Sequence, residues 1–398
     1  MKILTQEVVR MAMLTAQGLL IPPKASPTRD DLLAAIRRMG YLQIDTIQAV
    51  RRSQYLVLWS RLGHYDPSWL DEVHREGQLF EYYAHSLCYL PIEDYPIFRG
   101  RMLYDERTGN DWKNWAEAHP EMIDQVQSVI LEKGPVSSAD FDSKTISTGW
   151  GDVKYEKLAL QRMFSTGELM VPYRDNFRRY FDLRERVLPD WDDAKALDGD
   201  AARDALLLKT VYALGVAHED WFAPYYYFLK TGLTDILASF VATGQLIQVQ
   251  VENWDRPGYV HPDQWGLVEA SAAGDLIPSH TTFLSPFDPL VSDRGRALTA
   301  FNFDYRMEAY TPVKERQYGY FCLPILHKGC LVGRLDPKAH RKEKRMEIKN
   351  LYLEPDVYID EDLVTSLKST LEAFTSWHGM RELAITATQI PELQEALL

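Results

Sequence analysis

The sequence predicts an α+β fold in which three similar helix-and-hairpin units precede a β-rich C-terminal domain. Two observations carry this prediction: a weak pattern occurs three times before Pro278, and the residues after Pro278 read mainly as β-strands. The chain has 398 residues, of which 46% are hydrophobic and 25% charged. This mixture is typical of packed globular domains and excludes global disorder.

The repeated pattern is a short amphipathic helix followed by a glycine, a polar residue and a leucine. A glycine in the left-handed region ends a helix, so we expect positive φ at Gly77, Gly167 and Gly244. The residues that follow favour a two-stranded hairpin, with period-two alternation most evident at 247–252. A helical segment that ends in a helix and such a hairpin is a winged helix, of the helix-turn-helix class, so we predict three in tandem. The three copies are residues 70–79, 160–169 and 237–246.

The pattern places the domain boundaries. We predict winged helices at 1–120, 121–195 and 196–278, and a barrel-like domain with a C-terminal helix at 279–398. Within the last domain, strands are expected at 281–284, 318–326, 330–335 and 345–353, followed by a helix at 361–378 and a strand at 383–388.

Charge and cysteine content limit the class of protein. The net charge of −13 means that any polyanionic partner must be met by a local basic surface. The three cysteines are an odd number and none forms a C-x-x-C pair, so we expect a reducing cytoplasm and neither a disulfide scaffold nor a cysteine-rich zinc site. No apolar run approaches the ~18 residues of a membrane span, so no membrane partner is expected.

Several common chemistries have no motif here. The sequence lacks a G-x-x-x-x-G-K-[ST] loop, a G-x-G-x-x-G after a strand, an H-E-x-x-H helix and a G-x-S-x-G elbow. We therefore predict no nucleotide cofactor, no metal and no serine-hydrolase mechanism.

One polar pair has the spacing of a hydrolytic site. Residues 30–39 read as a helix that Gly40 ends, and 41–47 as a short strand. Residues two apart in a strand share a face, so Gln43 and Asp45 would lie side by side. A carboxylate beside an amide can hold one water, with Asp45 taking its proton and Gln43 fixing its orientation. From the residues alone, a solvated strand edge is the commoner interpretation.

Basic and aromatic residues flank this pair. Each basic cluster taken alone is more often a solvated surface, although phosphate contacts would need these side chains. The run 334–345 is dense enough for a phosphate-facing loop to be at least as good an interpretation. The candidates for DNA contact are Arg51, Arg52 and Arg61 of the helix predicted next, Tyr82 and His85 of the first hairpin, and Arg334, Lys338, Arg341 and Lys342 of the basic run.

These segments resemble the AlkZ/YcaQ family of bacterial winged-helix DNA glycosylases, from about residue 5 to about residue 380. The matching pieces are Leu42–Ile47, Ser53–Gly63, Glu81–His85, Leu284–Leu290 with Asp293 and Arg294, and Arg316–Phe321. The crosslink-unhooking YcaQ branch carries Gln, an apolar residue and Asp, which Gln43-Ile44-Asp45 satisfies; the antibiotic self-resistance branch carries Gln at the third position.

The resemblance implies three tandem winged helices and a β-barrel in a C shape around double-stranded DNA. It also favours catalysis by Gln43 and Asp45. The implied reaction is monofunctional hydrolysis of the N-glycosidic bond of N7-alkylated purines, including bulky adducts and interstrand crosslinks, in DNA repair. We expect a monomer without a cofactor, in the bacterial cytoplasm and at the nucleoid when bound to DNA.

Two other classes of function stay open at this point. A non-catalytic winged-helix transcriptional regulator would share the repeats and basic patches but would not need Asp45. A winged-helix scaffold that binds another protein would not need the basic run either. The preferred adduct is left open by the sequence.

Overall fold

The computed structural model describes residues 3–104, 118–141, 145–147, 152–227 and 230–398. The chain forms two compact units. The first combines residues 1–66 with 208–398, and the second comprises 67–207. The predicted division into four domains is finer than this and stays a prediction. No helix in the described ranges is long and apolar enough to cross a membrane.

The first unit contains two sheets, in the orders β1-β10-β11-β9 and β12-β13-β14-β15-β16. Its strands are β1 (Ile3–Leu4), β2 (Leu42–Gln43), β9 (Ala217–His218), β10 (Ile247–Val251), β11 (Gly258–Val260), β12 (Thr281–Phe283), β13 (Leu323–His327), β14 (Cys330–His340), β15 (Arg345–Leu353) and β16 (Glu382–Ile385). Its helices are α1 (Gln6–Ala16), α2 (Arg29–Met39), α3 (Ser53–Leu62), the end of α10 (Gly199–Leu214), α11 (Glu219–Tyr226), α12 (Leu233–Ala242), α13 (Trp265–Ala272), α14 (Arg294–Phe301), α15 (Glu361–Trp377) and α16 (Pro391–Leu397).

The second unit is built around two hairpins. Its elements are α4 (Ser68–Arg75), β3 (Leu79–Tyr83), β4 (Leu87–Pro91), α5 (Tyr95–Tyr104), α7 (Pro120–Lys133), β5 (Thr145–Ser147), β6 (Asp152–Lys154), α8 (Tyr155–Ser165), β7 (Leu169–Asp175), β8 (Arg178–Leu183), α9 (Arg184–Val187) and the start of α10. β3 pairs with β4, and β7 with β8, both antiparallel. The acidic stretch 190–200 takes part in packing, because the Asp193 carboxylate forms an ion pair with Arg99 at 2.8 Å.

The three predicted repeats fold in the same way. Helices α4, α8 and α12 each lead into an antiparallel hairpin, and the linking glycines have φ of 74°, 74° and 76°. In each copy the glycine N–H donates to the carbonyl three residues earlier, and the next N–H donates five residues back, at 2.8–3.2 Å. This pair of hydrogen bonds is the Schellman motif, which satisfies the last carbonyls of a helix. The expected positive φ at Gly77, Gly167 and Gly244 is confirmed.

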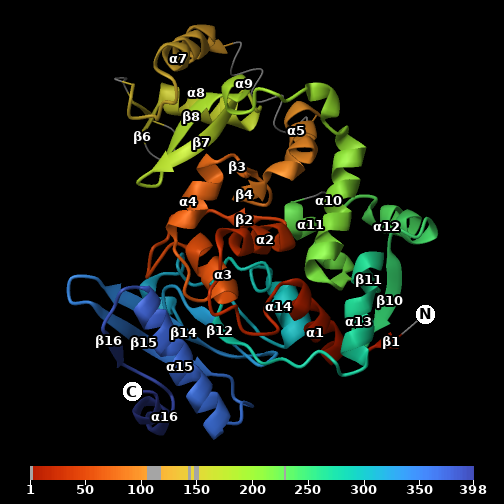
Figure 1. Cartoon of the computed structure of the whole chain (residues 1–398), viewed down its shortest axis with the longest axis vertical. Coiled ribbons are helices and arrows are strands. Elements are labelled where there is room, and N and C mark those ends of the chain that lie inside the picture. The colour runs from red at the N-terminus through yellow and green to blue at the C-terminus, as the bar shows by residue number, and fades with distance from the viewer. Residues whose placement is uncertain (1–2, 105–117, 142–144, 148–151, 228–229) are drawn as a thin grey trace. The chain divides into compact units, whose positions relative to one another are not determined.

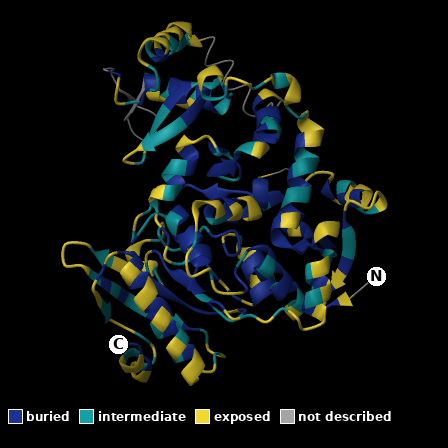
Figure 2. Ribbon diagram, viewed as in Figure 1, coloured by how far each residue is buried: buried dark blue, intermediate teal, exposed yellow. Residues whose placement is uncertain are grey.

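The C-terminal strands form an open five-stranded sheet, half of a barrel and not a closed one. Its neighbours pair antiparallel except for β15 and β16, which run parallel. Helix α15 packs against β12 and β16 (Figure 1). It buries leucines and Phe374, while exposed residues lie along its other side (Figure 2).

Helix α3 is fixed to this sheet by an aromatic cluster. The Trp59 ring of α3 lies 4.9 Å from Phe374 and 6.2 Å from Trp377 of α15, and 6.0 Å from Phe283 of β12, measured between ring centroids. Buried aromatic pairs of this kind add to stability beyond their area. Helix α3, which follows the segment with the predicted polar pair, is therefore attached to the rigid part of the unit.

Three expectations about local structure are wrong. The strand predicted at 41–47 is confined to Leu42–Gln43, because the Asp45 carboxylate accepts the Ile47 N–H at 2.7 Å and turns the chain. Arg51 and Arg52 precede α3, with Arg52 as its extended N-cap residue. The basic run is not a loop: residues 334–340 lie in β14, and residues 341–344 form the turn between β14 and β15.

We expect the Gly244→Ala substitution to lower the free energy of unfolding by about 1–2 kcal/mol. The left-handed backbone is the only source of strain, since a Cβ at this position would meet no atom within 4 Å. Urea denaturation measures the change. Gly266 of α13 also has open space around a Cβ, without a positive φ, so Gly266→Ala is the control and should be neutral or stabilising. Equal losses in the two variants would show that the φ of Gly244 carries no cost.

Candidate active site

Asp45 stands at a sharp turn just beyond β2. Its Oδ1 accepts the N–H of Ile47, and the side chain is partly exposed. Its Oδ2 accepts no hydrogen bond from the residues that the structure describes. One oxygen of this carboxylate is thus held in place while the other can accept a proton from a bound water.

Gln43 is the last residue of β2 and is only 8% exposed. The expectation of a solvated strand face shared with Asp45 does not describe it, since Leu42, Gln43 and Ile44 are all buried and Asp45 lies outside the strand. Gln43 and Asp45 remain two residues apart on one short segment of backbone. Any catalytic role of the pair depends on the turn at Asp45 and not on strand geometry.

One polar contact connects this segment to α3, and a second holds the first turn of α3. The Gln54 Oε1 accepts the N–H of Asp45 at 3.4 Å. The hydroxyl of the preceding residue, Ser53, lies 2.5 Å from the hydroxyl of Ser285, and both residues are fully buried. The first turn of α3 is thereby anchored on both sides.

The structure brings the two predicted basic clusters together. The Arg341 guanidinium donates to the carbonyl of Val50, and the Arg51 guanidinium lies 4.8 Å above the Trp377 ring. Burial lowers the pKa of Arg51, and the nearby charge of Arg341 acts in the same direction. Arginine stays charged despite such shifts. Positive charge therefore gathers beside the segment that joins Asp45 to α3.

His378 is a neutral neighbour of these cations. Its Nδ1–H donates to the Phe374 carbonyl at 2.7 Å, and its ring packs 4.8 Å from the Trp377 ring. Burial, together with the nearby charges of Arg51 and Arg341, lowers its pKa to about 3. His378 thus adds no positive charge at neutral pH.

Lys338 and Lys342 are exposed, on β14 and in the turn after it, and neither forms an ion pair within the described ranges. Both can reach a phosphate.

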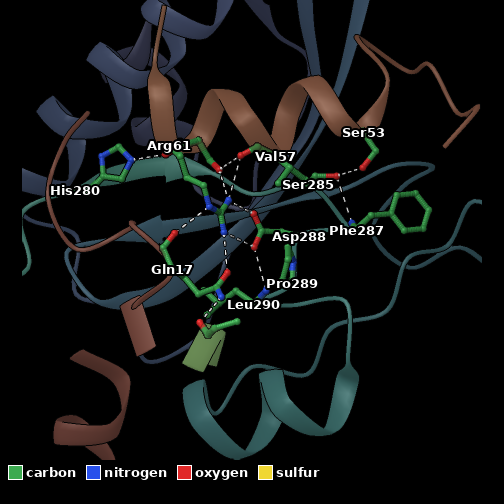
Figure 3. Close-up of polar contacts among 12 residues, drawn as sticks. Gln17, Ser53, Val57, Arg61, His280, Ser285, Phe287, Asp288, Pro289 and Leu290 are labelled. Carbon is green, nitrogen blue, oxygen red and sulfur yellow. Dashed lines mark hydrogen bonds and ion pairs between the residues drawn. The ribbon is translucent and has the colours of Figure 1, made fainter. Parts of the chain in front are cut away.

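Arg61, a sequence candidate for DNA contact, is buried in the structure. Its side chain is 2% exposed and its guanidinium binds Asp288 with both terminal nitrogens, at 2.5 and 3.1 Å (Figure 3). It also donates to the carbonyl and the side chain of Gln17, at 2.9 and 3.2 Å. Because Arg61 is buried and its donors are used inside the fold, we do not expect it to contact DNA.

Arg334 is likewise buried. Its side chain is 2% exposed, donates to Glu354 at 2.7 Å and lies 4.1 Å above the Tyr318 ring. The basic run therefore presents its later residues, and not Arg334, to solvent.

The two aromatic candidates of the first hairpin belong to the second unit. Tyr82 is 4% exposed and its hydroxyl donates to the Ser165 carbonyl at 2.6 Å, which speaks against base stacking. His85 lies in the bend between β3 and β4 and is partly exposed.

The residues whose roles sequence reasoning missed are Asp288 and Ser285, which it includes only within the family-like segment Leu284–Leu290. A usable signal was present in α3, where Arg61 shares an apolar helical stretch with Leu58 and Leu62 and so needs a buried carboxylate. In the part of the chain described, no group of three His, Cys, Asp or Glu side chains could hold a metal ion.

A family model for AlkZ-like DNA glycosylases matches residues 36–377. The chain belongs to this family. The matched region includes Asp45, α3 and the basic turn after β14. Membership in the AlkZ-like family makes DNA the partner and places the chain among the hydrolases of DNA repair.

A solved structure supports the fold of this AlkZ-like chain. The Streptomyces sahachiroi DNA glycosylase AlkZ has a TM-score of 0.63 and 16% sequence identity, over 98% of this chain and 100% of that one. At this identity the likeness concerns the mixed α+β fold alone.

We expect the Asp288→Asn substitution to lower the free energy of unfolding by about 3–5 kcal/mol, since it leaves the Arg61 charge buried without a counter-charge. Urea denaturation followed by tryptophan fluorescence measures it. The control is Lys24→Ala, which removes one partner of a solvent-exposed pair (side chains 74% and 21% exposed) and should cost less than about 1 kcal/mol. Similar losses in both variants would mean that the buried pair is not a main constraint on the fold.

Proposed function

We propose that this AlkZ-like chain is a monofunctional glycosylase that releases N7-alkylated purines from duplex DNA, including bulky adducts and interstrand crosslinks. The observation that carries the proposal is the state of Asp45. Its carboxylate is partly exposed, with one oxygen held by the Ile47 N–H, at the third position of the Gln-apolar-Asp signature. The family match supplies the reaction class, and the signature favours the crosslink-unhooking branch.

The chemistry follows from the leaving group. An N7-alkylguanine is already cationic, so the electron pair of the C1′–N9 bond departs with the base without prior protonation. The remaining demands are charge stabilisation for an oxocarbenium-like sugar and a placed water. Asp45 can meet both, as a negative charge and as the base that takes the water proton, while Gln43 orients the water. The products are the free alkylpurine and an abasic site.

Sequence also favours a single-step hydrolase. A lyase step needs an amine nucleophile, usually a lysine, to form a Schiff base with the sugar. Residues 25–112, which surround Asp45 in the sequence, contain no lysine.

The three helix-glycine-hairpin repeats support the assignment of three winged helices, a class that binds DNA. For phosphate contacts we retain five of the sequence candidates, all Lys or Arg side chains that reach solvent or lie close to Asp45 in the sequence. They are Arg51, Arg52, Lys338, Arg341 and Lys342 in the first unit, with His85 as a separate candidate in the second.

The direct test of the proposed function is excision from duplex DNA. Cationic N7-methylguanine and a nitrogen-mustard crosslink should both be released, whereas the neutral lesions uracil and hypoxanthine should not, because no second carboxylate is assigned to protonate them. Abasic sites are scored by alkaline cleavage. Efficient uracil release, or trapping of the protein on DNA by borohydride, would contradict the mechanism.

For Asp45→Asn we expect the single-turnover excision rate to fall by about 100-fold or more, the usual contribution of a general base. DNA affinity should persist, since the basic residues are unchanged. Fluorescence anisotropy with an undamaged duplex supplies the binding control. An excision rate equal to that of the wild type would remove Asp45 from the mechanism.

Binding should weaken linearly in a log–log plot of affinity against salt. Removing one phosphate contact, as in Lys338→Ala or Arg341→Ala, should reduce the slope by about 1. Lys24→Ala is the matched control, because the Lys24 charge is already compensated by Asp31 at 2.6 Å. Slopes that stay unchanged in both test variants would mean that the turn after β14 does not meet DNA.

A further inference from the structure

Gln54 is the buried polar residue next to the proposed general base. It is the second residue of α3 and is 1% exposed. Its Oε1 accepts the Asp45 N–H at 3.4 Å. This contact also assigns the amide orientation, since the opposite orientation would place two donors against each other.

The other end of the Gln54 amide is not satisfied. Nε2 is buried and donates to nothing in the part of the chain that the structure describes. A buried donor without an acceptor opposes folding, and an apolar side chain of similar size would avoid this cost. Structure alone therefore gives little reason for a glutamine at position 54.

Gln17 shows what a structural buried glutamine looks like in the same unit. It is 0% exposed, its Nε2 donates to the Ala213 carbonyl at 2.6 Å, and its Oε1 accepts from Arg61 at 3.2 Å. Both ends of this amide are used. Gln17 therefore stabilises the fold through both ends of its amide, whereas Gln54 contacts the backbone of Asp45 through one end.

Asp45 is held at two points. The Ile47 N–H fixes one carboxylate oxygen, and Gln54 fixes the peptide from which the side chain projects. Gln54 is itself held in position, because the hydroxyl of the adjacent Ser53 lies within hydrogen-bond distance, 2.5 Å, of the Ser285 hydroxyl. Removing the Gln54 contact would free the main chain at Asp45 without removing the carboxylate itself.

We infer that Gln54 is a positioning residue for the glycosylase reaction, which fixes the backbone of Asp45 so that its open carboxylate oxygen faces the attacking water. The inference rests on the proposed function. It adds a third residue to the Gln43 and Asp45 pair, one that acts through Asp45 and not on the substrate. A displacement of about 1 Å in a reacting group lowers rates by about 100-fold, so the effect of Gln54 is expected on the chemical step.

The test compares Gln54→Met with Gln17→Met in the full-length protein. Single-turnover release of N7-methylguanine, the Kd for the same duplex and the urea midpoint are measured for each. Gln54→Met should lower the rate about 10- to 100-fold with an unchanged Kd and an unchanged or higher urea midpoint. Gln17→Met should lower the urea midpoint and leave the rate of the folded protein unchanged.

Gln54→Glu serves as the conservative variant, because it keeps an acceptor oxygen for the Asp45 N–H. It should lose less rate than Gln54→Met, and it carries the test if the methionine variant does not fold. A Gln54→Met rate within twofold of the wild type, or a Gln54→Glu loss as large as that of Asp45→Asn, would overturn the inference.

Asp45→Asn in the same assay distinguishes the two failures. If Asp45→Asn is inactive while Gln54→Met keeps the wild-type rate, the positioning role is wrong and the proposed function stands. If the wild type releases no alkylpurine, the proposed function fails and the inference fails with it.

Discussion

The ion pair between Arg61 and Asp288 is the constraint on which the first unit depends. It lies in the interior, and its partners come from the end of α1, from α3 and from the turn after β12. Gln17 extends the network to the carbonyl of Ala213, near the end of α10. Burying two charges is costly unless every donor finds an acceptor, and here the guanidinium donates to four other oxygens besides the two carboxylate oxygens of Asp288. Such a network fixes the helix that follows the segment of the proposed general base.

Both ends of α3 are held by contacts to other parts of the first unit. The far end of α3 is fixed by Arg61, and its first turn by the contact of Ser53 with Ser285. The segment before α3 turns at Asp45, through a bond to its own backbone, and is then held from outside by Arg341. A rigid helix thus follows a short polar segment that contains Gln43 and Asp45. That division suits a hydrolase, in which a few groups must be placed accurately on a firm support.

Local signals in the sequence predicted local structure well. The three glycines, the helix that Gly40 ends and the hairpins all depend on residues close in the chain, and their backbone angles and hydrogen bonds agree with the expectation. The length of β2 was overestimated for a local reason as well, because an aspartate can turn the chain by accepting the N–H two residues on.

The roles of the arginines could not be read in the same way. Arg61 and Arg334 look like surface cations in the sequence, but their counter-ions and aromatic neighbours come from distant positions. The meeting of Arg51 with Arg341 is equally non-local. Whether a cation is buried is decided by packing, which a basic run in the sequence does not report.

The discontinuity of the first unit has a consequence for how the chain folds. Arg61 and Asp288 are 227 positions apart, and the whole of residues 67–207 is made between them during synthesis. Contacts of such long range close late, because the entropy of closing the loop must be met before they form. Residues 67–207 are complete on the ribosome while the first 66 residues still lack their partners from residues 208–398. The segment of the proposed general base is therefore translated early but completes its support late, so that a truncated nascent chain would carry Gln43 and Asp45 without the ion pair that fixes α3.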